Sequence, residues 1–199
     1  MEWGQASALQ LPDNQTALVA PTSDPSSLAL GVGVQNFTCG SDGTYASSGV
    51  LTKLFDITCL YGSDSFSTIQ TDAYSFWYNV SLQTSDAVSD LTTLPLFGEL
   101  YHVVGSDGSL SPEFDFTSTT FDDDAFVVTA PIASIPAPTG SSDIDWQQLN
   151  QTSGSLADQV FVVNTVAGQP PSSCDAGSDP ISVKYTAQYF FYGGSISSY

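Results

Sequence analysis

The chain has 199 residues, a length that fits one domain with a single hydrophobic core. Its hydrophobic content of 41% and its 12 Phe, 9 Tyr and 3 Trp residues indicate a folded globular protein and exclude a disordered one. Only two lysines oppose 21 acidic residues, and the formal charge of −19 excludes nucleic acid and anionic membranes as electrostatic partners. No apolar run of about 18 residues occurs, so no membrane-spanning helix is expected.

The first 27 residues predict an extended N-terminal arm, because they contain three prolines. Residues 28–199 predict a single β-domain, in which short segments rich in Val, Phe, Leu and Thr alternate with turn sequences. We expect strands at 28–38, 50–58, 73–82, 96–104, 112–117, 125–133, 157–166 and 182–192, and a Pro/Gly/Ser-rich loop at 134–145. The fold class is therefore all-β: a single-domain antiparallel β-sandwich or barrel with long loops.

The first expected strand contains "GVGVQNFTC" at 31–39, which begins like the Gly-x-Gly of a dinucleotide-binding loop. Such a loop needs a third glycine at the sixth position and a helix whose N-terminus receives the pyrophosphate. The sixth position here is Asn36, which begins an N-glycosylation sequence instead. We therefore expect no nicotinamide cofactor, and no other cofactor.

The three cysteines allow one disulfide and leave one free thiol. If 28–39 and 50–59 form a hairpin, Cys39 and Cys59 lie at its opposite ends, about 30 Å apart at ~3.3 Å per residue. A disulfide needs Cα atoms within about 7 Å. The preferred bridge is therefore Cys39–Cys174, with Cys59 as a buried free thiol.

Four acceptor sequences for N-glycosylation indicate a secreted protein of a eukaryote. Their asparagines are Asn14, Asn36, Asn79 and Asn150. The start Met1-Glu2-Trp3 has neither a basic segment nor an apolar run, so we expect that a secretory leader has been removed.

In the expected strand 73–82, the period-two pattern places Asn79 and Trp77 on the outer face. An outward Trp77, together with Tyr61, Tyr101 and Trp146, would form a patch that stacks on sugars or binds protein. Core packing is the alternative, and it is favoured for Trp146.

The candidate catalytic groups are few. His102 is the only histidine, which excludes a multi-histidine metal site, and no Gly-x-Ser-x-Gly elbow accompanies it. A glycosidase would need two carboxylates about 5–9 Å apart across a cleft, and the candidates are Glu99 and Glu113. The run Asp122–Asp124 lacks the alternating ligand spacing of a calcium loop. We expect no catalytic residue and no metal site.

Six segments resemble, in order, a family of secreted fungal domains of unknown function whose members are often labelled malate dehydrogenase. They are "GVGVQNFTC" at 31–39, "LTKLFDITCL" at 51–60, "SPEFDF" at 111–116, "DWQQL" at 145–149, "VFVVNTVAGQPPSSC" at 160–174 and "VKYTAQYFFY" at 183–192. The family also resembles that of a secreted blast-fungus effector essential for rice infection and linked to inhibition of a plant papain-like cysteine protease. The resemblance implies an effector of the plant apoplast that acts by binding; the chain has no arginine to partner His102 in a dehydrogenase.

The function expected first is therefore a secreted, monomeric protein that binds and inhibits a host papain-like cysteine protease through loops held on a β-scaffold. The candidate loops are the turn at Ser106, Asp107 and Gly108 and the segment that contains Ile135, Pro136 and Pro138. The alternative is a carbohydrate-binding or cell-wall protein that uses exposed aromatics. A glycoside-active enzyme is the third possibility.

Overall fold

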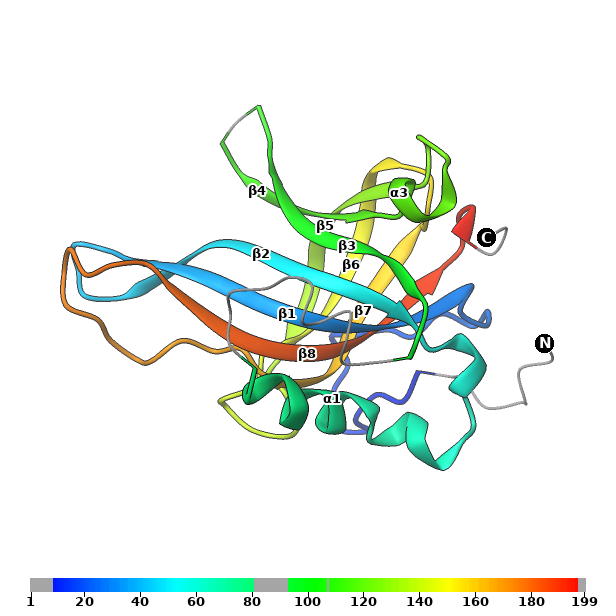
Figure 1. Ribbon diagram of the computed structural model, residues 1–199, viewed down its shortest axis with the longest axis horizontal. Helices are drawn as coiled ribbons and strands as arrows, with labels where there is room; N and C mark the ends of the chain where they lie inside the picture. Colours follow the sequence, from blue (N-terminus) through cyan, green and yellow to red (C-terminus); the bar gives the residue numbers. More distant parts are fainter. Residues whose placement is uncertain (1–8, 81–92, 107, 197–199) are drawn as a thin grey trace.

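The computed structural model describes residues 9–80, 93–106 and 108–196. Eight antiparallel strands form one closed barrel in which each strand pairs with its neighbours in sequence and the last pairs with the first (Figure 1). The strands are β1 (Ser27–Cys39), β2 (Tyr45–Asp56), β3 (Leu96–Val104), β4 (Leu110–Asp115), β5 (Phe126–Ile135), β6 (Trp146–Gly154), β7 (Gln159–Ala167) and β8 (Ile181–Tyr192). The expected all-β, single-domain fold is confirmed, and its form is a barrel.

The helical elements are short. Within residues 9–80, 93–106 and 108–196 they are the 3-10 turns η1 (Thr58–Leu60) and η2 (Asp64–Ser67), and the helices α1 (Ile69–Tyr78) and α3 (Thr117–Thr120). In the described part of the chain, no helix is long and apolar enough to cross a membrane. Residues 9–26 contain neither helix nor strand, and their Leu9 and Leu18 are buried; the extended arm over 1–27 stays a prediction.

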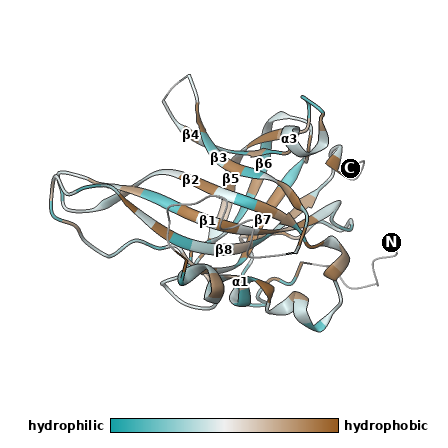
Figure 2. Ribbon diagram, viewed as in Figure 1, coloured by the Kyte–Doolittle hydropathy of each residue, from teal (hydrophilic) through white to brown (hydrophobic). Residues whose placement is uncertain are grey.

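Two hydrophobic cores lie on opposite sides of one part of the barrel wall. Side chains such as Phe114, Tyr185 and Tyr189 fill the barrel interior. A second cluster, which includes Phe161, Phe190 and residues of α1, lies outside the strands. Figure 2 shows hydrophobic (brown) segments along the strands of the barrel. The strand β8 is buried on both faces, so its side chains are buried at nearly every position from Tyr185 to Tyr192.

Helix α1 covers the outer face of β1, β7 and β8, which we name the covered wall (Figure 1). Side chains of β8 hydrogen-bond to α1 and to the turn η2 that precedes it. The Thr186 hydroxyl donates to the Gln70 carbonyl of α1 (2.7 Å), and the Gln188 amide donates to the Phe66 carbonyl of η2 (2.7 Å). Among the described residues, α1 does not cover the outer faces of β3, β4 and the adjoining part of β2, although the short helix α3 contacts β3; we name these faces the bare wall.

Two expectations about strands are wrong. Residues 73–78, expected in the strand 73–82, belong to α1, because Ile69, Ala73 and Trp77 recur at helical spacing and pack together on the second core. Residues 81 and 82 lie outside the described residues. The strand β6 was not expected, because its glutamines and asparagine conceal its alternation.

Candidate functional site: the hairpin end of the barrel

Alternate connections of an up-and-down barrel lie at the same end. One end therefore carries the four connections β1–β2, β3–β4, β5–β6 and β7–β8, at 40–44, 105–109, 136–145 and 168–180. We name it the hairpin end. Figure 1 shows the β1–β2 and β7–β8 connections side by side on the left of the view. Both candidate loops of the sequence belong to this end.

A disulfide joins the first and last of these connections. Cys39 and Cys174 are bonded, with Cα atoms 5.9 Å apart and a sequence separation of 135 residues. The backbone N–H of Cys174 also donates to the carbonyl of Gly43 in the β1–β2 turn (2.9 Å). The predicted pairing is confirmed, and a disulfide is compatible with an extracellular protein.

The expectation of a buried Cys59 is wrong, because this thiol is exposed. The strand expected over 50–58 ends at Asp56, and Cys59 lies in the 3-10 turn η1. The turn leaves the sheet, so the period-two pattern that places side chains inside no longer applies there.

The candidate loops differ in exposure. Ser106 and Gly108 are exposed in the β3–β4 turn, which is closed by a hydrogen bond from Gly105 N–H to the Ser109 carbonyl (2.8 Å). Asp107 lies outside the described residues. In the other loop, Ile135 ends β5, while Pro136 and Pro138 are exposed.

A cavity of about 170 Å³, which we name the mouth cavity, opens into the barrel at the hairpin end. Seven of the eight strands contribute to its lining, and Ile144 of the β5–β6 connection joins them. Val50, Leu100 and Leu149 give part of its lining an apolar surface. The polar groups of Gln35 and Gln147 also line it.

A chain of three buried hydroxyl groups lies beside the mouth cavity. The hydroxyls of Thr52 and Tyr185 are 2.6 Å apart, and those of Tyr185 and Tyr189 are 2.9 Å apart. Burial raises the pKa of Tyr185 to about 12, against opposing hydrogen bonds, and raises the pKa of Tyr189 well above its ordinary value. Both phenols therefore keep their protons at neutral and acidic pH.

The residues that carry these buried hydroxyls also explain the two glycines in "GVGV". A Cβ atom at Gly31 would overlap the Tyr189 ring, and one at Gly33 would overlap Thr52 and the Leu51 backbone. The indole N–H of Trp77 donates to the Gly33 carbonyl from the outside (3.0 Å). The glycines therefore lie in the middle of β1, where an aromatic ring approaches the backbone, and not in a strand-to-helix loop.

His102 lies on β3 and lines the mouth cavity. Its Nδ1 atom is buried and has no hydrogen-bond partner in the described part of the chain. Burial lowers the pKa of His102 below the ordinary value of 6.5, because a charged imidazole would lose its hydration there. The side chain is therefore a neutral imidazole at neutral pH.

The expected aromatic patch does not form. Trp77, expected on the outer face, is buried in the second core. Its segment is a helix, in which side chains do not alternate between two faces as they do in a strand. Trp146 is also buried in the second core, as favoured. Tyr61 packs edge-on against Phe66, while Tyr101 lies on the bare wall.

A different aromatic pair is open to solvent. Tyr74 and Tyr78, one helical turn apart on α1, have ring centroids 5.9 Å apart. With Gln169, Pro170 and Pro171 they line a groove of about 760 Å³. The spacing of four residues between these tyrosines is the signal that would have found the pair, had the segment been recognised as a helix.

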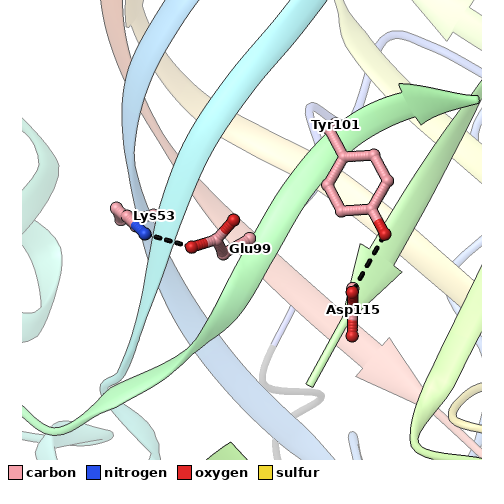
Figure 3. Close-up of polar contacts among 4 residues, drawn as sticks. All are labelled: Lys53, Glu99, Tyr101 and Asp115. Atoms are coloured by element: carbon pink, nitrogen blue, oxygen red, sulfur yellow. Dashed lines mark hydrogen bonds and ion pairs between the residues drawn. The ribbon is translucent and has the colours of Figure 1, made fainter. Parts of the chain in front are cut away.

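The bare wall carries a polar cluster (Figure 3). Lys53 of β2 forms an ion pair with Glu99 of β3. The Tyr101 hydroxyl lies 2.8 Å from a Glu113 oxygen and 2.9 Å from an Asp115 oxygen. Both glutamates thus lie on the outer face, and neither lines the mouth cavity. This arrangement does not favour a glycosidase over a binding protein.

The pKa values on the bare wall follow from these contacts. Burial, followed by the hydrogen bonds to Glu113 and Asp115, raises the pKa of Tyr101. Burial by itself would raise the pKa of Asp115, but hydrogen bonds from Thr117 and Tyr101 outweigh it and hold this pKa below 3.8. In the described part of the chain, no group of three or more His, Cys, Asp or Glu side chains could hold a metal ion.

The sequon asparagines divide into two pairs. Asn14 and Asn79 are exposed. Asn36 and Asn150 are partly buried in strands, where their side-chain oxygens accept hydrogen bonds from Ser182 (2.6 Å) and Gln159 (3.0 Å). Glycosylation at all four positions stays a prediction.

The comparisons with known proteins give a family but no function. Residues 20–193 match the model of a family described as "Protein of unknown function (DUF3455)". No curated protein and no solved structure matches the chain. The expected membership in a family of unknown function is confirmed, whereas a fungal source and a likeness to an effector remain proposals. The chain belongs to the DUF3455 family of proteins of unknown function.

Proposed function

We propose that the chain is a secreted protein that binds another protein through its hairpin end, and that its partner is a papain-like cysteine protease of the plant apoplast. The observation that carries this proposal is the disulfide between the first and last connections of that end. It restrains the two connections relative to each other, so less conformational entropy is lost when a partner binds.

The β3–β4 hairpin supplies apolar contact surface. Val104 and Leu110 are paired across the two strands, next to the turn, and are 71% and 39% exposed. Exposed apolar side chains on a protruding turn can enter a cleft and anchor a complex. The hairpin diverges from the rest of the hairpin end in Figure 1, so a cleft could close around it.

The positions of the lysines favour survival near proteases. The chain has only two, and it has no arginine. Lys53 lies within β2 and is paired with Glu99, while Lys184 lies within β8 and is bound to backbone carbonyls. A protease that cleaves after basic residues would have to unfold a barrel strand first.

The test is a titration of a plant papain-like cysteine protease with this protein, at acidic pH, with a fluorogenic peptide as substrate. We expect a sharp equivalence point. The double substitution Val104→Ser and Leu110→Ser should weaken inhibition at least ten-fold. The matched control is Phe121→Ser, an exposed apolar residue in the connection at the opposite end. Undiminished hydrolysis across a panel of such proteases would refute the proposal.

The groove beside Tyr74 and Tyr78 favours a second candidate function, the binding of a neutral saccharide. Two aromatic rings give stacking surfaces, and Ser141, Ser142 and Gln169 give hydrogen-bonding groups around them. Retention on a glycan array that is lost in Tyr78→Ala and kept in Phe121→Ala would support this function. Equal retention of the two variants would place the sugar elsewhere.

A further inference from the structure

We propose that the mouth cavity binds a small, neutral ring compound that carries one hydrogen-bond acceptor, a class represented by aromatic ketones and aldehydes. This site lies inside the barrel and does not rest on the proposed binding of a protease.

The first argument is an unused proton. Thr52, Tyr185 and Tyr189 are each at most 1% exposed, and their three hydroxyls share two hydrogen bonds. Three hydroxyls carry three protons, and two bonds use two of them. In the described part of the chain, these hydroxyls have no further hydrogen bond, so one buried donor lacks an acceptor.

The directions of the two hydrogen bonds decide which of the three hydroxyls holds the unused proton. Burial raises the pKa of Tyr185, while the hydrogen bonds with Thr52 and Tyr189 lower it, as bonds accepted by its oxygen do, so the unused proton is on Tyr185; both tyrosines line the mouth cavity. A buried donor without an acceptor is unfavourable, because it loses its hydrogen bond to water and gains none in the protein. A ligand oxygen in the cavity would accept this proton and remove the cost.

The second argument is size. At about 170 Å³ the cavity is slightly larger than an apolar cavity of about 150 Å³ that accepts benzene. It is smaller than the roughly 300–1,000 Å³ of sites for drug-sized ligands. The ligand is therefore a single ring with a small substituent.

The third argument is charge. No Lys, Asp or Glu lines the cavity, and its lining joins the apolar Val50, Leu100, Leu149 and Val162 to uncharged polar groups such as Gln35 and Gln147. A carboxylate would lose its hydration there without a cation to pair with, and it would also be repelled by the net charge of −19. A cation would find no carboxylate. Only a neutral ligand fits both the walls and the donor.

The experiment compares three probes of similar size by ligand-observed NMR titration: acetophenone, which has an acceptor; ethylbenzene, which has none; and benzoate, which is an anion. We expect acetophenone to bind about ten-fold more tightly than ethylbenzene, the effect of about one hydrogen bond. Benzoate should not bind. Equal binding of all three probes, or binding of none, would overturn the proposal.

Two variants locate the binding. The double substitution Tyr185→Phe and Tyr189→Phe removes both phenol hydroxyls and keeps the rings, so the advantage of acetophenone over ethylbenzene should disappear. Tyr101→Phe removes a hydroxyl on the bare wall and should leave all three affinities unchanged. Should the double variant fail to fold, nuclear Overhauser contacts between acetophenone and the side chains of Leu100 and His102 in the native protein decide whether the ligand lies in the mouth cavity. Contacts elsewhere would overturn the proposal.

Discussion

The covered wall and the bare wall belong to the same barrel but use opposite means of stabilisation. On the covered wall, Trp77, Phe161 and Phe190 form a second hydrophobic core beneath α1. On the bare wall, an ion pair and a tyrosine shared by two carboxylates lie next to water. Apolar burial contributes more than partly exposed ion pairs, so the covered wall should carry most of the stability.

The two walls also differ in how the polar and apolar residues of a strand relate to burial. On β4 the buried Phe114 lies between the less buried Glu113 and Asp115, as alternation requires. On β8 the side chains from Tyr185 onward are buried on both faces, and Thr186 and Gln188 are satisfied by backbone carbonyls of the covering segment. Polar residues in a strand therefore do not always mark a solvent face.

The largest expected effect is that of Trp77→Ala. This substitution removes a buried indole and its hydrogen bond to Gly33, and we expect a loss of about 3–5 kcal/mol in the free energy of unfolding. The measurement is chemical denaturation. The matched control on the same helix is Tyr78→Ala, which is 66% exposed and should cost less than about 1 kcal/mol. Equal losses would contradict the prediction that the buried core of the covered wall carries most of the stability.

The second prediction concerns the disulfide. The double substitution Cys39→Ala and Cys174→Ala opens a loop of 135 residues. Because the cross-link restricts the unfolded chain, we expect a loss of about 2–5 kcal/mol. Denaturation of the native protein with and without a reductant checks the result, with Cys59→Ala as the control for the free thiol. A midpoint unaffected by the reductant would contradict the prediction.

The two lysines give a direct comparison of the walls. Lys184 donates to the carbonyls of Trp77 (2.8 Å), Tyr78 (3.3 Å) and Val80 at the end of α1, and it lies 4.3 Å from the centre of the Trp77 ring. Lys184→Met should cost about 1–3 kcal/mol, because carbonyls at a helix end lose a charged donor. Lys53→Met on the bare wall should cost at most about 1 kcal/mol. The reverse order in thermal denaturation would refute the distinction between the walls.

The smallest effect is a pH dependence from His102. Its folded-state pKa is lower than the ordinary 6.5, so below pH 6.5 the unfolded state binds this proton more readily. The free energy of unfolding should therefore fall as the pH falls from about 6.5 toward 5. This effect opposes the relief of charge repulsion that the net charge of −19 predicts on acidification.

The variant His102→Gln separates the two contributions. It should lose less stability between pH 7 and pH 5 than the native protein, as followed by melting temperature. Asp115 does not interfere in this range, because its lowered pKa means that its contribution is lost only in stronger acid. Identical pH profiles for the two proteins would show that His102 is not shielded from solvent.

The fold class, the disulfide and most strands could be predicted from the amino-acid sequence, because turn residues and period-two alternation are local signals. The extended geometry of a hairpin was sufficient to exclude Cys39–Cys59. The faces of segment 73–82 could not be predicted, since its aromatic residues fit a strand as well as a helix until the covered wall gives them a partner.

The position at which the barrel closes and the side chains that meet inside it could be known from the folded structure alone. Closure brings β8 beside β1, and this pairing sets Tyr189 against Gly31. It also joins His102 of β3 and Tyr185 of β8 in one cavity, although 83 residues separate them in the chain. Contacts between such distant residues depend on strand register and barrel closure, which no local pattern encodes.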